Sequence, residues 1–328
     1  MMHAAPLPQS ATQAPEVRYR TESPAALLED PATLAVFGYG KAAPALDDPR
    51  FLRVASEPVH AAEAGMLEQW RVAGTVTSGV EAGVRWSEGG GWLYAAISIE
   101  QPDTDPAATA STAYGLLARF MAARRGYRVQ RMWNLLADIN QGEGDLERYK
   151  RFCLGRGNSL AGLFDEGYPA ATAVGHHDSQ RALQVYCLAS RDAGQRIENP
   201  RQMSAWHYPR QYGPVAPSFA RAMRLPAGDA LAISGTAAIR GHESRHADDL
   251  AAQLAETWAN LDALLAAGGM PAGFNPQSPL KVYLRQQGDA APVDAFLDQH
   301  APGVPRLLLE ADICRRELLV EIDGWRYA

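Results

Sequence analysis

The stretch 229-DALAISGTAAI-239 decides the fold that we predict for the C-terminal part of the chain. Its apolar residues have the length of one buried strand, and the segment that follows, 248–266, places four leucines and a tryptophan on one helical stripe. The same reasoning then predicts a strand at 280–286, a helix at 292–300 and a hairpin-like pair at 307–314 and 318–327. We therefore expect a domain at 226–328 in which one sheet packs against two helices.

The rest of the chain predicts a second α+β domain, at 17–225, so the fold class is α+β with two domains. Strand-like runs at 92–100 and 127–140 alternate with helix signals at 107–126 and 145–156, the second helix having Asp145 as its expected N-cap. The segment 195–226 is rich in Pro, Tyr, Trp and Arg without periodicity, which is typical of a functional loop. Residues 1–16 are expected to form a disordered tail.

Composition excludes several classes of protein. The 328 residues are 47% hydrophobic and 21% charged and carry a net charge of -6, which argues against a nucleic-acid binder or a binder of acidic membranes. No run of apolar residues is long enough to cross a membrane, and no signal peptide opens the chain. Three widely spaced cysteines favour a reducing compartment, so we expect a cytoplasmic protein, either a monomer or a small homo-oligomer.

Motifs for metals and nucleotides lack the context that they require. The run 242-HESRH-246 matches a zinc-protease pattern, but it lies between a strand and the start of a helix instead of on a helical turn. The glycines of 234-SGTAAIRG-241 do not have the spacing of a phosphate-binding loop, and no G-x-S-x-G elbow is present. We therefore expect no metal and no cofactor.

Glu321 is the main candidate for chemistry. Strand alternation separates Val320 and Ile322 from Glu321 and Asp323, so the two carboxylates share one face. If that face lines a pocket, burial raises the carboxyl pKa and suits Glu321 to proton transfer; the alternative is a solvent-facing residue on a two-sided strand. Cys314, at the end of the preceding strand, is either a site residue or a small core residue.

A set of cations and tyrosines suggests an anionic, ring-shaped ligand, although each one alone is typical of an ordinary surface position. The cations lie near strand ends, helix faces or the aromatic loop, and the tyrosines accompany them. The candidate ligand-binding residues are Arg156, Arg201, Arg221, Lys281 and Arg306, with Tyr149, Tyr186, Tyr208 and Tyr212.

Several stretches, in the same order along the chain, resemble the chorismatases, which are chorismate lyases and 3-hydroxybenzoate synthases. They are 132-MWNLLADIN-140, 149-YKRFCLGR-156, 206-WHYPRQYGP-214, 233-ISGTAAIRGHESRH-246 and 311-ADICRRELLVEI-322. The part from about residue 228 also resembles the small, trimer-forming RidA/YjgF fold, and a fused chain would imitate that trimer internally. The resemblance implies chorismate as the substrate, Arg306 as a carboxylate ligand, Gly235 and Thr236 as substrate contacts, and Glu321 as the acid that lines the pocket.

The resemblance also implies a product. A cysteine seven residues before the glutamate, as in Cys314 and Glu321, resembles the members that aromatise the ring to 3-hydroxybenzoate and release pyruvate. Ala237 and Ala238 depart from the pattern of strict 3-hydroxybenzoate formers, so 4-hydroxybenzoate is an expected second product. Two alternatives stay open: a chorismate hydrolase that makes a dihydroxycyclohexadiene carboxylate, and a RidA-like protein that binds ligands or hydrolyses imines.

Overall fold

The structure is a computed structural model that describes residues 12–100, 105–160, 163–164 and 167–328. It combines three larger sheets and one two-stranded sheet with flanking helices, so the predicted α+β class is confirmed. Most of the tail predicted at 1–16 lies outside the described residues. Its last part is ordered, because Trp92 Nε1 donates to the Gln13 carbonyl at 2.7 Å and the Tyr327 hydroxyl donates to the Pro15 carbonyl at 2.6 Å.

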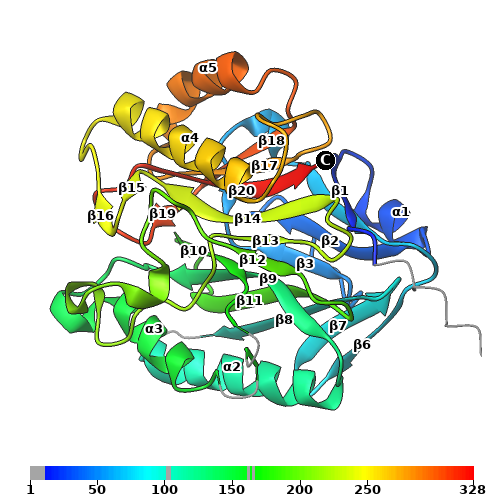
Figure 1. Cartoon of the computed structure of the whole chain (residues 1–328). Helices are drawn as coiled ribbons and strands as arrows, with labels where there is room; N and C mark the ends of the chain where they lie inside the picture. Colours follow the sequence, from blue (N-terminus) through cyan, green and yellow to red (C-terminus); the bar gives the residue numbers. More distant parts are fainter. Residues whose placement is uncertain (1–11, 101–104, 161–162, 165–166) are drawn as a thin grey trace, which may run out of the picture.

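The first large sheet has seven strands and lies in the lower half of Figure 1, with two helices on its outer face. This sheet contains the predicted strands at 92–100 and 127–140. The predicted helices at 107–126 and 145–156 pack on it. In spatial order the strands are β19 (Asp312–Ile313), β10 (Ala170–His176), β9 (Arg128–Ala137), β11 (Ala182–Ser190), β8 (Trp92–Glu100), β7 (Val84–Gly89) and β6 (Thr77–Glu81). The helices are α2 (Pro106–Ala123) and α3 (Arg148–Gly157).

The second large sheet also has seven strands and carries its helices on the opposite side of the molecule (Figure 1). In spatial order the strands are β12 (Gln195–Ile197), β13 (Ala222–Arg224), β14 (Ala230–Ala237), β20 (Val320–Tyr327), β17 (Leu280–Leu284), β18 (Arg306–Glu310) and β4 (Glu57–Pro58). The helices are α4 (Leu250–Ala267) and α5 (Ala290–His300). Strands on both sides of residue 225 pair within this sheet, since Met223 lies opposite Ala232.

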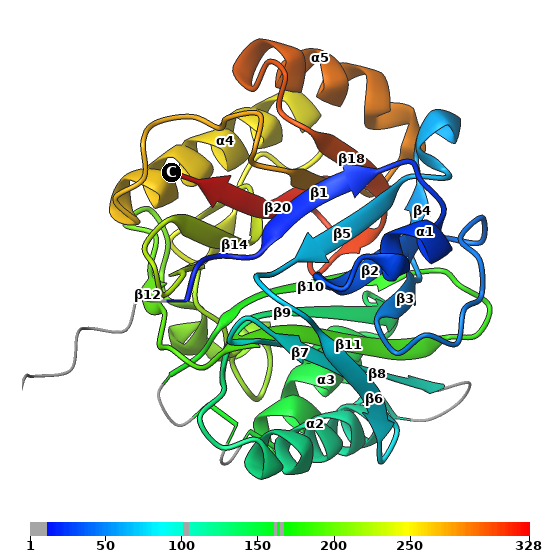
Figure 2. The same ribbon diagram turned by 90° about the vertical axis from the view of Figure 1, so that its right-hand side faces the viewer.

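A third sheet lies toward the viewer in Figure 2. It has four strands in the order β1 (Glu16–Arg20), β5 (Leu67–Arg71), β2 (Thr33–Tyr39) and β3 (Phe51–Val54). The short helix α1 (Pro24–Glu29) connects β1 to β2. The mixed residue pattern before residue 92 did not predict this sheet.

One four-stranded unit occurs three times in the chain. The units are β1-β5-β2-β3, β8-β11-β9-β10 and β14-β20-β17-β18, and in each the first two pairings are antiparallel and the third is parallel. In each unit a helix, α1, α2 or α4, follows the first strand. The three units surround one apolar core, to which all three sheets contribute. The single chain therefore repeats one motif around a common centre.

Two predicted local features are wrong. The pair expected at 307–314 and 318–327 is not a hairpin, because β17 lies between β18 and β20 and pairs with both. The connection instead crosses the end of β17, and its short strand β19 pairs with β10 of the other large sheet. Asp145 lies in a short 3-10 turn, so Glu147 takes the N-cap position of α3.

Two buried ion pairs connect the units across the common core. Lys281 on β17 contacts Glu68 on β5 at 3.0 Å, and Arg131 on β9 contacts Asp323 on β20 at 2.9 Å. All four side chains are at most 2% exposed. Removing one partner of such a pair leaves a buried charge and costs about 3–5 kcal/mol. The pairs therefore fix how the three sheets lie against each other.

Candidate active site

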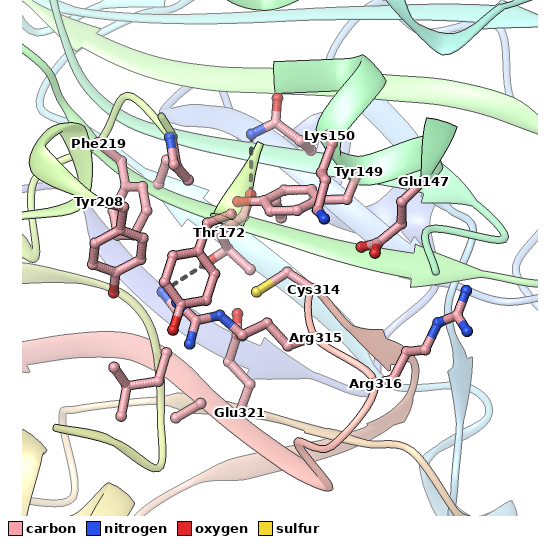
Figure 3. A pocket seen from close by; sticks show the side chains of 18 of the residues that line it. Glu147, Tyr149, Lys150, Thr172, Tyr208, Phe219, Cys314, Arg315, Arg316 and Glu321 are labelled. Atoms are coloured by element: carbon pink, nitrogen blue, oxygen red, sulfur yellow. Dashed lines mark hydrogen bonds between the residues drawn. The ribbon is translucent and has the colours of Figure 1, made fainter. Parts of the chain in front are cut away.

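The main cavity lies where the second large sheet meets the edge of the first. It has a volume of about 270 Å³ and is lined from β14 and β20, from β10 and α3, from the aromatic loop and from the connection at 314–317. Figure 3 shows Glu321 and Cys314 pointing into this space, with Tyr149 facing them from α3. The cavity thus lies between two of the four-stranded units, and β10, at the end of one unit, faces β14 and β20 of the other.

A break in the strand pairing makes room for Glu321. The β14–β20 register shifts between Ile233 and Thr236, and Gly235 lies within this bulge. A Cβ atom at position 235 would lie 1.9 Å from Glu321 Oε1, so the carboxyl group occupies the space that any other residue would fill. The Gly235 N–H donates to Thr172 Oγ1 on β10 at 3.0 Å, which holds the bulge against the other sheet.

Glu321 is in its neutral form in this setting. Its side chain is 4% exposed and accepts no hydrogen bond from the residues that the structure describes. Burial raises the pKa of Glu321 to about 8; nearby Asp323 also raises it, while Arg131 and Arg221 lower it. The result is a buried acid that carries a proton near neutral pH and is aimed at a cavity.

Cys314 also stays protonated. Burial raises the pKa of its thiol, and the nearby Glu321 raises it further. A thiol of this kind is a poor nucleophile, because the thiolate is the reactive form. Cys314 therefore contributes shape and a weak hydrogen-bond donor to the cavity wall.

Two buried guanidinium groups line the cavity. Arg156 is 4% exposed and donates from Nη2 to the Ser218 carbonyl at 2.6 Å. Arg221 is 3% exposed and donates from Nη2 to the Met203 carbonyl and to the Tyr208 hydroxyl. Two buried cations in the wall of one cavity favour an anionic ligand.

Eight of the predicted site residues line this one cavity: Tyr149, Arg156, Tyr208, Tyr212, Arg221, Gly235, Cys314 and Glu321. The other five lie elsewhere. Tyr186 stacks on Trp133 in the common core at 4.9 Å between ring centroids, and Lys281 forms its ion pair with Glu68 there.

The remaining three are held by their own neighbours. Arg306 pairs with Asp294 and Asp298 of α5, and Arg201 donates to Glu256 and Asn260 of α4. Thr236 is buried opposite Ile322, on the sheet face that packs under the helices. Each of these cations or hydroxyls is already satisfied within the protein.

Several cavity residues were not expected from the sequence. Arg315 lies over the Tyr212 ring at 3.9 Å, and Arg316 donates to the Asn140 and Gly142 carbonyls at the rim. Both directly follow Cys314, so two cations next to a suspected site residue were an available signal. The other unexpected lining residues are Asn134, Glu147, Lys150, Ala171, Thr172, Ala173, Gln211, Pro217, Phe219, Ile239 and Glu317.

The zinc-like run 242–246 has no helical geometry. It spans a small hairpin of β15 (Ile239–Arg240) and β16 (Glu243–Ser244), where His242 Nδ1 lies 3.3 Å from the Tyr212 hydroxyl. His246 lies 3.8 Å from Glu256 instead. The two imidazoles therefore do not share one face of a helix. No helix in the described part of the chain is long and apolar enough to span a membrane.

Comparison with known proteins agrees with this geometry. Residues 68–189 match the family model described as chorismatase FkbO/Hyg5-like, N-terminal. A 3-hydroxybenzoate synthase of Streptomyces hygroscopicus is 34% identical over 280 residues, which is 78% of this chain and 80% of the relative. A chorismatase of Streptomyces rapamycinicus is 34% identical over 275 residues, covering 78% of this chain and 81% of its own length.

A solved structure extends the match to nearly the whole chain. The crystal structure of a chorismatase aligns with a TM-score of 0.85 and 29% sequence identity, covering 97% of this chain and 99% of that one. The chain belongs to the chorismatase family.

Proposed function

We propose that this enzyme converts chorismate into 3-hydroxybenzoate and pyruvate, with Glu321 as the general acid and without a cofactor. The observation that carries the proposal is a neutral, buried carboxyl group, without a partner among the described residues, in a cavity that two buried guanidinium groups also line. The curated relative named 3-hydroxybenzoate synthase supports the choice of substrate and product.

Chorismate fits the chemistry of the cavity. It is a ring that carries two carboxylates, one of them on an enolpyruvyl ether, so it needs cations at two places and an acid at the ether. Arg156 and Arg221 are the buried cations, and Lys150 and Arg315 add charge to the wall. Tyr149 and Phe219 supply aromatic surface for the ring.

Glu321 starts the reaction by giving its proton to the methylene carbon of the enolpyruvyl group. The ether then becomes an oxocarbenium ion, and Glu321 becomes a carboxylate beside it, which stabilises the positive charge. Breaking the bond between ring carbon C3 and the ether oxygen releases pyruvate, while the neighbouring C4 hydroxyl closes on C3 and gives up its proton, which forms an epoxide. The epoxide opens at its C4–O bond and loses the C3 hydrogen as a proton, which leaves the hydroxyl at C3 of an aromatic ring. Direct loss of the C4 hydrogen, without the epoxide, gives 4-hydroxybenzoate instead. The aromatic acid and pyruvate together contain the atoms of chorismate and no others, whereas the diol and pyruvate of a hydrolase contain one added water.

Cys314 and Ala237 bear on the product. Both line the cavity with Glu321, so they lie where a ring intermediate would rest. We assign Cys314 to the route that aromatises the ring, and Ala237 to a looser fit that allows some 4-hydroxybenzoate. Cys314→Ala is expected to shift product toward the diol while pyruvate release continues; an unchanged ratio would reduce Cys314 to packing.

The experiment is to incubate the purified protein with chorismate, resolve the products by chromatography and measure pyruvate separately. We expect 3-hydroxybenzoate and pyruvate in equal amounts, with 4-hydroxybenzoate as a minor product. Pyruvate with the diol and without an aromatic acid would establish the hydrolase instead. No turnover would leave a RidA-like ligand-binding or imine-hydrolysing protein.

The three unpaired cysteines support a place in the reducing cytoplasm.

A further inference from the structure

Asp323 lies two residues after Glu321 on the same face of β20, and it is fully buried. One of its oxygens, Oδ2, accepts four hydrogen bonds from three strands. The donors are Arg131 Nη2 at 2.9 Å, Trp133 Nε1 at 2.9 Å, Thr172 Oγ1 at 2.7 Å and the Tyr283 hydroxyl at 3.1 Å. Four donors, one of them a guanidinium, therefore converge on one carboxylate oxygen.

The network of Asp323 reaches the wall of the active site. Thr172 lines the cavity, donates to Asp323 and accepts the N–H of Gly235, the residue on which the Glu321 carboxyl packs. Tyr283, another donor to Asp323, lies directly opposite Glu321 in the β17–β20 pair. The second oxygen of Asp323, Oδ1, is buried and has no partner among the described residues. A fixed negative charge therefore lies next to the proposed acid.

We propose that Asp323 is a positioning residue that keeps the proton on Glu321, and that Arg131 and Thr172 hold Asp323 in the place where it does so. This inference rests on the proposed function, because it assigns a reason for Glu321 to be a proton donor. Asp323 itself touches no cavity and takes no part in bond making.

The charges around Glu321 explain why such a residue is needed. Arg131 and Arg221 both favour the ionised form of Glu321, whereas Asp323 opposes them. The remaining titratable groups of the cavity are Glu147, Tyr149, Lys150, Arg156, Tyr208, Tyr212, Cys314, Arg315, Arg316 and Glu317. A site built to bind a dianion needs its cations, and those cations would strip the proton from its acid. Asp323, paired with the core cation Arg131, opposes this loss of the proton.

The test is the midpoint at which Glu321 loses its proton, read in the substrate-free protein from the infrared band of the protonated carboxyl that disappears in Glu321→Gln. We expect Asp323→Asn to lower this midpoint by about one to two pH units. The alkaline limb of kcat/KM should move down by the same amount. An unchanged midpoint in a folded Asp323→Asn protein would overturn the proposal.

Two further variants keep the test decisive. If Asp323→Asn fails to fold because Arg131 is left unpaired, the comparison moves to Arg131→Met and to the double variant Arg131→Met/Asp323→Asn. The double variant should have the lower midpoint of the two, and equal midpoints would refute the role of Asp323. Glu68→Gln is the matched control, since it breaks the other buried ion pair of the core and should leave the midpoint unchanged.

The infrared midpoint does not depend on turnover. If the protein does not act on chorismate but Asp323→Asn lowers the midpoint of Glu321, only the proposed function is contradicted. A protein that acts on chorismate with an unmoved midpoint would contradict the role of Asp323 alone. A merely structural Asp323 would lower turnover at every pH without moving the limb.

Discussion

Glu321 and Gln184 occupy similar places in two of the four-stranded units, since each lies near the start of the strand that comes last along the chain. Their side chains have opposite roles. Gln184, on β11, accepts the N–H of Ala55 and donates to the Arg53 carbonyl, both at 2.9 Å. Its amide thereby ties the first large sheet to the edge of the third sheet. Glu321, on β20, faces the edge of the first large sheet and has no such partner among the described residues.

The backbone accounts for this difference. The pairing of β8 with β11 is continuous from Trp92 to Glu100, whereas the pairing of β14 with β20 is interrupted at the bulge that contains Gly235. The continuous pair brings its polar side chain against a neighbouring backbone, and the interrupted pair leaves space for a ligand. The same four-stranded arrangement thus forms a binding site in the unit where the β14–β20 pair has a bulge and Glu321 has no partner among the described residues.

The largest expected effect is on turnover in Glu321→Gln. Loss of the proton donor should lower kcat by about 10²–10⁴-fold, while the fold stays intact because glutamine has the same shape. The measurement is pyruvate release under saturating chorismate. The matched change in the second unit, Gln184→Glu, should leave kcat unchanged. Full activity of Glu321→Gln would contradict the acid role and the comparison itself.

Gly235→Ala should also lower kcat, but by less than Glu321→Gln does. The added Cβ would lie 1.9 Å from Glu321 Oε1, so the carboxyl must move. A displacement of this order costs up to about 10²-fold in rate. Gly288→Ala is the control, because nothing lies within 4 Å of a Cβ at that position. Equal kcat in both variants would show that the carboxyl position is not critical.

Arg156→Gln tests which cations bind the substrate. Truncating one partner of a buried charge pair costs about 2 kcal/mol or more, so KM should rise by about 30-fold or more. Arg306→Gln, which changes a cation held by Asp294 and Asp298 away from the cavity, should leave KM and kcat unchanged. Steady-state kinetics of the two variants separates the cations, and a raised KM in Arg306→Gln alone would reverse the assignment.

A separate effect is expected on the pH dependence of stability. The pKa of Glu321 is raised from 4.5 to about 8, so the folded protein holds a proton that the unfolded chain releases. Stability should therefore fall as pH rises from about 4.5 to 8, by up to about 5 kcal/mol, and stay level above that range. Glu321→Gln lacks this contribution. Denaturant unfolding of both proteins at pH 5 and pH 9 measures it, and parallel pH profiles would contradict a buried neutral acid.

Local patterns predicted the elements that carry the site. The periodicity of 248–266 and the alternation around Glu321 correspond to α4 and to the inner face of β20. These signals depend on neighbours within one element, so they survive in the sequence. The resemblance of scattered motifs to chorismatases added the family, which the comparisons confirm.

Contacts between distant segments were not predicted. The third sheet and the threefold repeat follow from pairings that join residues far apart in the chain, and the expected hairpin at 307–327 was wrong because β17 inserts between its arms. The same limit applies to the cations. A sequence gives the charge of Arg306 or Lys281, but only the fold shows that Asp294 or Glu68 already neutralises it.

The sequence by itself therefore determined the α+β class, the order of strands and helices in the C-terminal part, and the candidate acid with its cysteine. The tertiary structure alone decided which arginines line the cavity, how the bulge at Gly235 opens it, and that Asp323 lies fixed beside Glu321. Periodicity is set within a few residues, whereas the protonation state of a buried group depends on every charge and void that packing brings near it.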